Sequence, residues 1–388
     1  RAVTRVAART ARPGGWGASR RGATTLPGRV AGLVFFTGFP GFIGKRLVAR
    51  LLTDDPELRI AALVEPSMVD RARTAAGELD GGDRVEILAG DIGERGLGLS
   101  TEDLGRLRSE VTVAFHLAAI YNLAVPLEVA QRVNVEGTGN VLELLKGCER
   151  LERLNYVSTA YVAGDRHGVV YEHELVLGQG FKNHYESTKF QAELWVREMM
   201  DRVPTTIYRP AIVVGDSKSG VTQKFDGPYY LLRTIAVSVA RKTPIPQFGA
   251  SGAPFNVVPV DFVVDALASV SAEPAAAGET LHLVDPDPIS ARELLTALSR
   301  EYAGREPGYK VPPRLVESSL RFKTVRDIFS GAPQESIRYL NHEVRFDTRR
   351  ADDLLAKAGL RCPRFDEYVG AMVSFFREHE GDEALVPA

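Results

Sequence analysis

A glycine-rich turn between two apolar segments constrains the fold of this chain most. Residues 31–36 are apolar and include aromatic side chains, which predicts a buried strand. Residues 42–52 carry apolar side chains at helical spacing, which predicts an amphipathic helix. Gly38, Gly41 and Gly44 therefore lie at a strand-to-helix turn, the context in which a glycine triplet binds a dinucleotide.

Each glycine of this triplet has an expected role. Gly38 would allow the tight turn, Gly41 would let a pyrophosphate approach the backbone, and Gly44 would let the helix pack close to the strand. The first amides of the helix would then face the phosphate charge. The spacing is Gly-x-x-Gly-x-x-Gly, so an ordinary turn is the alternative interpretation. The residues predicted to contact the cofactor here are Thr37, Gly38, Phe39, Gly41, Phe42, Ile43 and Gly44.

Glu65 bears on which nicotinamide cofactor is used. It follows a predicted strand at residues 60–64 and lies 21 positions after Gly44. An acidic residue at about this distance commonly binds the ribose hydroxyls and favours NAD over NADP. Arg71 and Arg73 follow closely and could instead meet a 2′-phosphate. The residues therefore leave NADPH and NADH both open, although Glu65 favours NADH. The alternative for Glu65 is a solvated residue at the end of a strand.

A third predicted strand, at residues 85–88, is followed by Asp91 and Ile92. The carboxyl ends of strands in an open α/β sheet border the ligand crevice. We therefore expect Asp91 to accept a hydrogen bond from the adenine amino group, and Ile92 to pack on the ring. A cap on a helix or turn is the alternative for Asp91.

A fourth predicted strand, at residues 113–117, ends in small side chains. Ala118 and Ala119 would let the ribose and pyrophosphate approach the backbone. His116 is predicted to be a hydrogen-bonded core histidine instead of a catalyst. Asn134 is predicted to order the backbone near the site, with simple helix packing as an equal alternative.

Three residues have the chemistry of carbonyl reduction. A predicted strand at residues 154–157 delivers Thr159, and Tyr185 and Lys189 lie one helical turn apart on the same helix face. A phenol has a pKa of about 10, and a nearby ammonium lowers it. Tyr185 would donate a proton to the carbonyl oxygen as hydride reaches carbon, while Thr159 orients that oxygen. Tyr185 and Lys189 are also predicted to contact the cofactor, and Lys189 would bond the nicotinamide ribose. An ordinary amphipathic helix face is the alternative for the Tyr-x-x-x-Lys spacing.

Together these residues resemble an extended short-chain dehydrogenase/reductase, in the branch of fatty acyl-CoA reductases and thioester reductases with a male-sterility type NAD-binding domain. The matching stretches are residues 37–44, 157–162, 185–189, 208–217 and 256–261, and together they span residues 33 to about 270, most of the chain.

The resemblance implies an α/β fold, a Rossmann-type doubly wound parallel sheet with a smaller C-terminal region that covers the substrate. It also implies that Thr159, Tyr185 and Lys189 are the catalytic residues. Pro210 and Ile212 fall where the family places backbone beside the nicotinamide. Acyl-CoA reductases that use NADPH usually carry a basic residue where this chain has Glu65, so the resemblance favours NADP while that residue favours NAD.

Composition limits the other possibilities. The chain has 388 residues, of which 44% are hydrophobic and 25% charged, as in globular proteins. A net charge of −2 gives no footprint for nucleic acid. The 2 cysteines are too few for a disulfide framework, which favours a cytoplasmic location. An apolar run of about 18 residues, which a transmembrane span needs, is missing from the sequence.

Three regions are predicted along the chain. Residues 1–30 contain 7 Arg and neither Asp nor Glu, so we expect a disordered leader, a fragment end or an upstream mis-start. Residues 31–215 are predicted to form the NAD(P)-binding domain. Residues 216–388 are predicted to form a mixed substrate-binding cap with segments that return to the sheet.

The leading functional hypothesis is hydride transfer to an apolar carbonyl, namely an acyl thioester of CoA or acyl carrier protein, which gives an aldehyde or alcohol. The apolar segment at residues 228–239 favours it as an acyl pocket, although packing against the main domain is its more ordinary role. A nucleotide-sugar epimerase or dehydratase, a hydroxy-compound dehydrogenase and a non-catalytic dinucleotide sensor are the alternatives. A homodimer is also possible, through helices at residues 129–147 and 185–200.

Overall fold

The fold is built on a sheet of seven parallel strands. The computed structural model describes residues 32–121, 125–247, 252–310 and 338–386, and the expectation for residues 1–30 lies outside them. The strands, in spatial order, are β3 (Val85–Ala89), β2 (Arg59–Val64), β1 (Leu33–Thr37), β4 (Val111–His116), β5 (Arg153–Val157), β7 (Thr205–Pro210) and β11 (Thr280–Leu283). The chain order reverses between β1 and β4, which confirms the predicted doubly wound parallel sheet.

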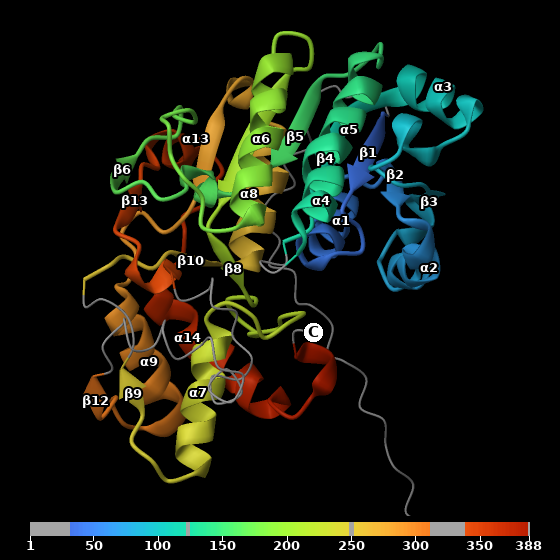
Figure 1. The fold of residues 1–388 in the computed structure, drawn as a ribbon. Coiled ribbons are helices and arrows are strands. Elements are labelled where there is room, and N and C mark those ends of the chain that lie inside the picture. Colours follow the sequence, from blue (N-terminus) through green and yellow to red (C-terminus); the bar gives the residue numbers. More distant parts are fainter. Residues whose placement is uncertain (1–31, 122–124, 248–251, 311–337, 387–388) are drawn as a thin grey trace, which may run out of the picture.

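Helices cover both faces of this sheet (Figure 1). Val34 and Phe36 of β1 belong to one hydrophobic core, whereas Phe35 belongs to the other, because successive side chains of a strand point to opposite faces. The first core includes residues of α1 (Phe42–Asp54), α2 (Val69–Gly77), α8 (Val260–Ser271) and α13 (Arg349–Lys357). The second includes residues of α3 (Thr101–Glu110), α5 (Gly137–Lys146) and α6 (His184–Met199).

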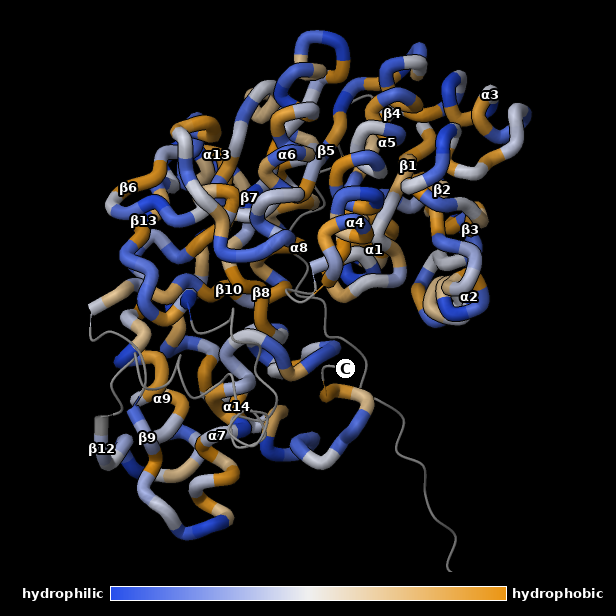
Figure 2. Tube along the Cα trace, viewed as in Figure 1, coloured by the Kyte–Doolittle hydropathy of each residue, from blue (hydrophilic) through white to orange (hydrophobic). Residues whose placement is uncertain are grey.

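In a strand that is buried on both faces, apolar residues do not alternate with polar ones, and the strands of this sheet have that pattern. In Figure 2 the apolar positions run along the strands of the sheet and along the helices that face them. All five residues of β1 are buried. Among the described residues, no helix is both long and apolar enough to cross a bilayer.

A second, mostly helical lobe lies beyond the carboxyl edge of the sheet (Figure 1). It contains α7 (Tyr229–Ala240), α9 (Ala291–Ala303) and α14 (Phe365–His379), with the short paired strands β9 (Pro246–Gln247) and β12 (Tyr309–Lys310). The paired strands β8 (Ile212–Val214) and β10 (Val257–Pro259) lie between this lobe and the sheet. A further pair, β6 (Gly168–Val170) and β13 (Val344–Phe346), joins the C-terminal part of the chain to the region after β5.

The apolar segment at residues 228–239 forms α7 and packs within this lobe. Tyr229, Leu232 and Ile235 are buried, and the Tyr229 ring lies 5.2 Å from that of Phe225. Phe376 of α14 lies 4.9 Å from the Phe225 ring. Most of the apolar surface of α7 therefore stabilises the lobe itself.

The contact between α1 and β1 depends on a glycine. A Cβ at Gly44 would lie 2.3 Å from the carbonyl oxygen of Gly38, inside the van der Waals limit. The Phe36 ring would also be within 3.4 Å of that Cβ. Only glycine lets the first turn of α1 lie this close to the end of β1, as the sequence predicted.

The substitution Gly44→Ala is expected to lower the free energy of unfolding by about 1–3 kcal/mol, because the added methyl group forces backbone atoms apart. Gly105→Ala is the matched control, since nothing lies within 4 Å of a Cβ there and the residue is in the middle of the exposed α3. That control is expected to stabilise the fold by about 0.5–1 kcal/mol. Urea denaturation measures both, and equal effects would show that the α1–β1 contact is not tight.

Candidate active site

The turn after β1 has the shape of a dinucleotide cradle. Gly38 has a φ of 92°, a conformation that disfavours other residues, and a Cβ there would lie 2.9 Å from the amide nitrogen of Ala118. Gly41 is the N-cap of α1, and no described side chain hydrogen bonds to the first amides of the helix. Free amides at a helix N-terminus are suited to a phosphate, so the residues present fit the predicted cofactor.

Thr37 and Phe39 contribute to this cradle through the core. The Thr37 side chain is fully buried, and its Oγ1 lies 2.7 Å from Nδ1 of His116. The same oxygen accepts a hydrogen bond from the Ala118 amide at 3.2 Å. Phe39 is 4% exposed and belongs to the core. Their side chains thus hold the turn and the loop after β4, which leaves backbone atoms to face a cofactor.

His116 has the predicted character of a core histidine. It is 2% exposed, and its Nε2 lies 3.0 Å from Oγ1 of Thr138, which in turn donates to the Asn134 carbonyl at 2.7 Å. Burial lowers the pKa of His116 to about 3. The ring is therefore neutral near pH 7 and structural in role.

Asn134 connects the loop after β4 to the catalytic helix. Its Oδ1 accepts from the Ile120 amide at 2.8 Å, and its Nδ2 donates to the Ile120 carbonyl at 3.1 Å. The same Nδ2 donates to Oγ1 of Thr188 on α6 at 3.0 Å. Asn134 lies in a π-helical turn (Gln131–Glu136) between α4 (Leu127–Ala130) and α5, a feature often found at functional sites. It therefore orders backbone beside Ala118 and Ala119.

Asp91 is engaged with protein groups. Its Oδ1 accepts from the Gly93 amide at 2.7 Å, and its other oxygen forms an ion pair with Arg132. Ile92 is 8% exposed and packs against Gly137 of α5. These contacts are those of a turn cap, the alternative that the sequence left open, and contact with adenine remains a prediction.

Thr159 and Tyr185 meet at the carboxyl edge of the sheet. Thr159 follows the end of β5, and its Oγ1 lies 3.5 Å from the carbonyl oxygen of Pro210, next to the end of β7. Tyr185 is half-buried in the first turn of α6, and the Thr159 side chain acts to lower the pKa of its phenol. Asn183 caps this helix, accepting from the Glu186 amide at 3.0 Å. Two hydroxyl groups can thus converge on one carbonyl oxygen.

Lys189 is held by groups that sequence reasoning missed. The side chain is 2% exposed, and Nζ donates to the Tyr156 hydroxyl at 2.9 Å and to the Val157 carbonyl at 2.8 Å. Nζ also lies 4.4 Å from the centroid of the Tyr156 ring. Burial lowers the pKa of Lys189 to about 7, against the opposing charge of Glu193. Tyr156 looks like any other buried residue of a β-strand, so the local sequence does not indicate that it contacts Lys189.

The pKa of Tyr185 moves in the direction opposite to the predicted one. Burial raises it to about 12, while the hydrogen bond with Thr159 lowers it by a smaller amount. Lys189 does not lower it, because an amine with a pKa of about 7 is neutral at the pH where Tyr185 would lose its proton. Tyr185 is therefore protonated near pH 7, the state that a proton donor requires.

Asp226 acts electrostatically on Tyr121, in the loop after β4, and on Tyr230, in α7 of the second lobe. Burial and then the charge of Asp226 raise the pKa of Tyr121 to about 12 and that of Tyr230 to about 12. Tyr121 also acts electrostatically on Tyr185. The ammonium of Lys224 lies 5.8 Å from the Tyr121 ring centroid. No sequence motif identifies these residues.

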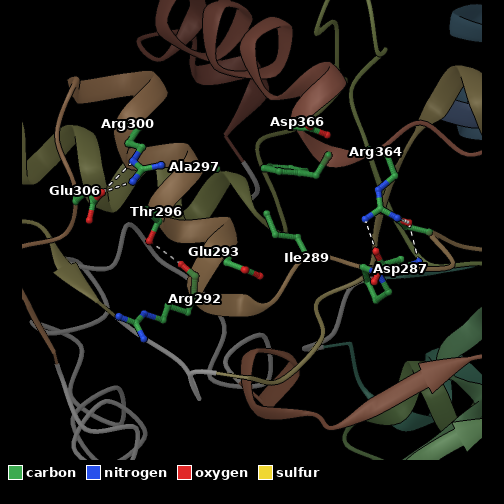
Figure 3. A pocket seen from close by; sticks show the side chains of 13 residues that line it. Asp287, Ile289, Arg292, Glu293, Thr296, Ala297, Arg300, Glu306, Arg364 and Asp366 are labelled. Atoms are coloured by element: carbon green, nitrogen blue, oxygen red, sulfur yellow. Dashed lines mark hydrogen bonds and ion pairs between the residues drawn. The ribbon is translucent and has the colours of Figure 1, made fainter.

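The hollow drawn in Figure 3 is a separate feature of the second lobe. It has a volume of about 730 Å³ and is lined by α9 and by residues that precede and begin α14. Arg364 points toward Asp287, and Arg300 toward Glu306, so these four charges form ion pairs. Thr159, Tyr185 and Lys189 do not line it. It is therefore not the catalytic site.

This fold and this site define an NAD(P)-dependent oxidoreductase of the extended short-chain dehydrogenase/reductase class. The chain belongs to the male sterility protein family, whose profile matches residues 36–267, more than half of its length. This match confirms the family that the sequence motifs indicated.

Known relatives are reductases and larger synthetases. Fatty acyl-CoA reductase 1 of Arabidopsis thaliana is 26% identical over 320 residues, which cover 64% of this chain and 64% of that protein. Nonribosomal peptide synthetase asaC of Aspergillus flavus is 28% identical over 288 residues, which cover 69% of this chain and 27% of the synthetase. The chain thus spans only about a quarter of the length of that synthetase.

Solved structures agree with the fold. The crystal structure of the terminal R domain from the myxalamid PKS-NRPS biosynthetic pathway matches with a TM-score of 0.74 and 27% identity, over 90% of this chain and 91% of that one. UDP-glucuronic acid 4-epimerase from Bacillus cereus matches with a TM-score of 0.63 at 18% identity, which is a likeness of fold alone.

The pKa of Lys189 predicts a pH dependence for carbonyl reduction. The ammonium stabilises the tyrosinate that remains after Tyr185 donates its proton, so the rate requires charged Lys189. Because that pKa is about 7, kcat/KM should be level below pH 7 and fall about tenfold per pH unit above it. Steady-state assays between pH 5.5 and pH 9 measure the profile.

Lys189→Arg is the informative control for this profile, since a guanidinium stays charged across the whole range. In that variant kcat/KM should no longer fall above pH 7, even if its value is lower at every pH. A wild-type profile that remains level to pH 9 would contradict the assignment.

Proposed function

We propose that this protein reduces an acyl thioester with a nicotinamide dinucleotide, releasing a thiol and an aldehyde. The observation that carries the proposal is the convergence of the Thr159 and Tyr185 hydroxyls beside buried Lys189, at the edge of the sheet where the glycine turn lies. The relationship to a fatty acyl-CoA reductase and the match to an R domain over nine-tenths of both chains support a thioester substrate.

The chain's own groups account for the proton movements of this reaction. When bound, the reduced dinucleotide supplies a hydride to the carbonyl carbon. Thr159 and Tyr185 hydrogen bond to the carbonyl oxygen, and Tyr185 donates its proton to that oxygen to give a neutral hemithioacetal. Lys189 stabilises the tyrosinate that remains. Tyr185 then removes the hydroxyl proton, the carbon–sulfur bond breaks, and the thiolate is protonated to leave an aldehyde and a thiol.

The acyl carrier and the extent of reduction form the second part of the proposal. Both CoA and a carrier-protein phosphopantetheine present the same thioester, so one site serves either source. A second hydride transfer to the aldehyde would use Thr159, Tyr185 and Lys189 in the same roles and give an alcohol. Tyr121 acts electrostatically on Tyr185, and Asp226 acts on Tyr121 and Tyr230, so these three residues would contact the acyl group or its carrier arm.

We further propose that NADH is preferred over NADPH. Glu65 is exposed at the end of β2, where its carboxylate accepts hydrogen bonds from the amide and hydroxyl of Ser67. A carboxylate fixed there can bind ribose hydroxyls and repels a 2′-phosphate. Two nearby arginines could favour NADPH by binding its 2′-phosphate, but one of them, Arg73, lies 3.6 Å from the carboxylate of Asp70.

The substitution Tyr185→Phe tests the reaction. Removing the proton donor should lower kcat by about 10²–10⁴-fold with palmitoyl-CoA and NADH or NADPH. The dissociation constant of the reduced cofactor, measured by its fluorescence, should change little because the ring remains. Wild-type protein that binds cofactor but oxidises none with palmitoyl-CoA or a palmitoylated carrier protein would refute thioester reduction.

The substitution Glu65→Gln tests the cofactor preference. Loss of the negative charge should raise the ratio of kcat/KM for NADPH to that for NADH about tenfold, which corresponds to roughly 1.4 kcal/mol. Glu57→Gln is the matched control, because Glu57 is also exposed but lies before the start of β2. An unchanged ratio in Glu65→Gln would remove Glu65 from the ribose site.

A further inference from the structure

A fully buried ion pair lies behind the catalytic residues. Arg209 and Glu193 are both 0% exposed. The Arg209 Nη2 donates to Oε1 of Glu193 at 2.6 Å, and its Nε lies 3.2 Å and 3.1 Å from the two carboxylate oxygens. The carboxylate also accepts from the Ser158 hydroxyl at 2.7 Å. The hydride-transfer chemistry described above uses neither charge.

These contacts join the three elements that deliver the catalytic side chains. Ser158 is adjacent to Thr159 at the end of β5, and Arg209 precedes Pro210 in β7. Glu193 lies on α6, one turn after Lys189. The Glu193 carboxylate therefore connects Ser158, next to Thr159, and Arg209, next to Pro210, to the helix that carries Lys189.

Other groups complete the hydrogen bonds of the guanidinium. Arg209 Nη1 donates to the Glu172 carbonyl at 3.2 Å and lies 3.2 Å from Nε2 of His282. Its Nη2 also donates to the Glu174 carbonyl at 2.8 Å. On the outer side, Nε of Arg197 donates to Oε1 of Glu193 at 3.1 Å. With every polar atom satisfied, the pair can have only one geometry, which is what a positioning device needs.

We propose that Glu193 and Arg209 are positioning residues that set the Thr159 end of β5 and the Pro210 end of β7 against the Lys189 face of α6. The inference rests on the proposed function, because the geometry that the pair holds is that of the reacting groups. Arg209 and Glu193 do not contact substrate or cofactor in this assignment and act through Ser158, Pro210 and Lys189.

The same carboxylate also governs the charge of Lys189. The titratable groups that face Lys189 are His116 from β4, Tyr156 from β5, and Tyr185 and Glu193 from α6. Burial lowers the pKa of His116 to about 3 and raises the pKa of Tyr156, so both are neutral near pH 7. Tyr185 is neutral there as well. Glu193 is thus the group among the described residues that raises the pKa of Lys189.

The substitution Glu193→Gln is the first test. It keeps an acceptor for Ser158 but removes the charge, so Lys189 should lose its proton at lower pH. The basic limb of the kcat/KM profile should move down by about one pH unit, which is about a tenfold loss at pH 8. The dissociation constant for NADH at pH 6 should stay within about twofold of the wild-type value. A profile with an unmoved limb would overturn the electrostatic part of the proposal.

A double variant separates positioning from stability. Glu193→Gln alone leaves the Arg209 charge buried without its partner, and that variant could fail to fold. Glu193→Leu combined with Arg209→Met removes both charges and should restore a Tm near that of the wild type. If the pair positions the catalytic groups, kcat stays at least about tenfold low in this folded double variant, while KM changes little. Recovery of both Tm and kcat would overturn the proposal.

Arg197→Met is the matched control, because Arg197 contacts the same carboxylate but is 26% exposed and leaves the Ser158 and Arg209 contacts in place. Its pH profile should match that of the wild type.

A readout without turnover distinguishes failure of this proposal from failure of the proposed function. If the wild type reduces no thioester, the NADH dissociation constant can be followed against pH by fluorescence, since Lys189 is predicted to bond the nicotinamide ribose. The pH at which binding weakens should be lower in Glu193→Gln. An identical pH dependence in both proteins would overturn the electrostatic part of this proposal independently of the substrate.

Discussion

The site depends on the direction of the strands. Seven parallel strands place all of their carboxyl ends at one edge, and the reversal of order between β1 and β4 opens a crevice there. β1 ends at the glycine turn, β4 at the loop that Asn134 holds, β5 at Thr159 and β7 at Pro210. Residues far apart in the chain therefore meet at this edge, and the second lobe lies beyond it.

The chemistry is set by which buried groups carry charge. Burying an ammonium away from water costs free energy. For Lys189 this cost is offset because its Nζ donates hydrogen bonds to the Tyr156 hydroxyl and the Val157 carbonyl. Its pKa of about 7 places it between the charged and neutral forms near neutral pH. Tyr185 has a pKa of about 12 and keeps its proton. A retained phenol proton next to a cation is the arrangement that reduction requires, since the cation stabilises the anion formed on donation.

Local patterns predicted the elements and the order of the site well. The apolar run before Gly38 became β1, the periodic segment after it became α1, and the spacing of Tyr185 and Lys189 placed both on α6. These features depend on neighbours within a few residues, because the spacing of apolar residues along the sequence reflects which face of a helix or strand is buried. Thr37 and Asp91 hydrogen bond to protein groups through their side chains, because a polar residue at a strand end can satisfy either the protein or a ligand, and their contacts with a cofactor stay predictions.

The sequence by itself determined the parallel α/β architecture and the glycine turn, and it predicted the Thr-Tyr-Lys set, because each arises from short-range spacing. Only the tertiary structure decided how those groups are held and charged. Tyr156 reaches Lys189 across 33 positions, and Ser158 reaches Glu193 across 35. The pKa values of Tyr185 and Lys189 follow from burial, which depends on what the whole fold packs around them. Contacts between distant residues leave no periodic trace in one sequence, so the supporting network becomes visible only when the strands are assembled.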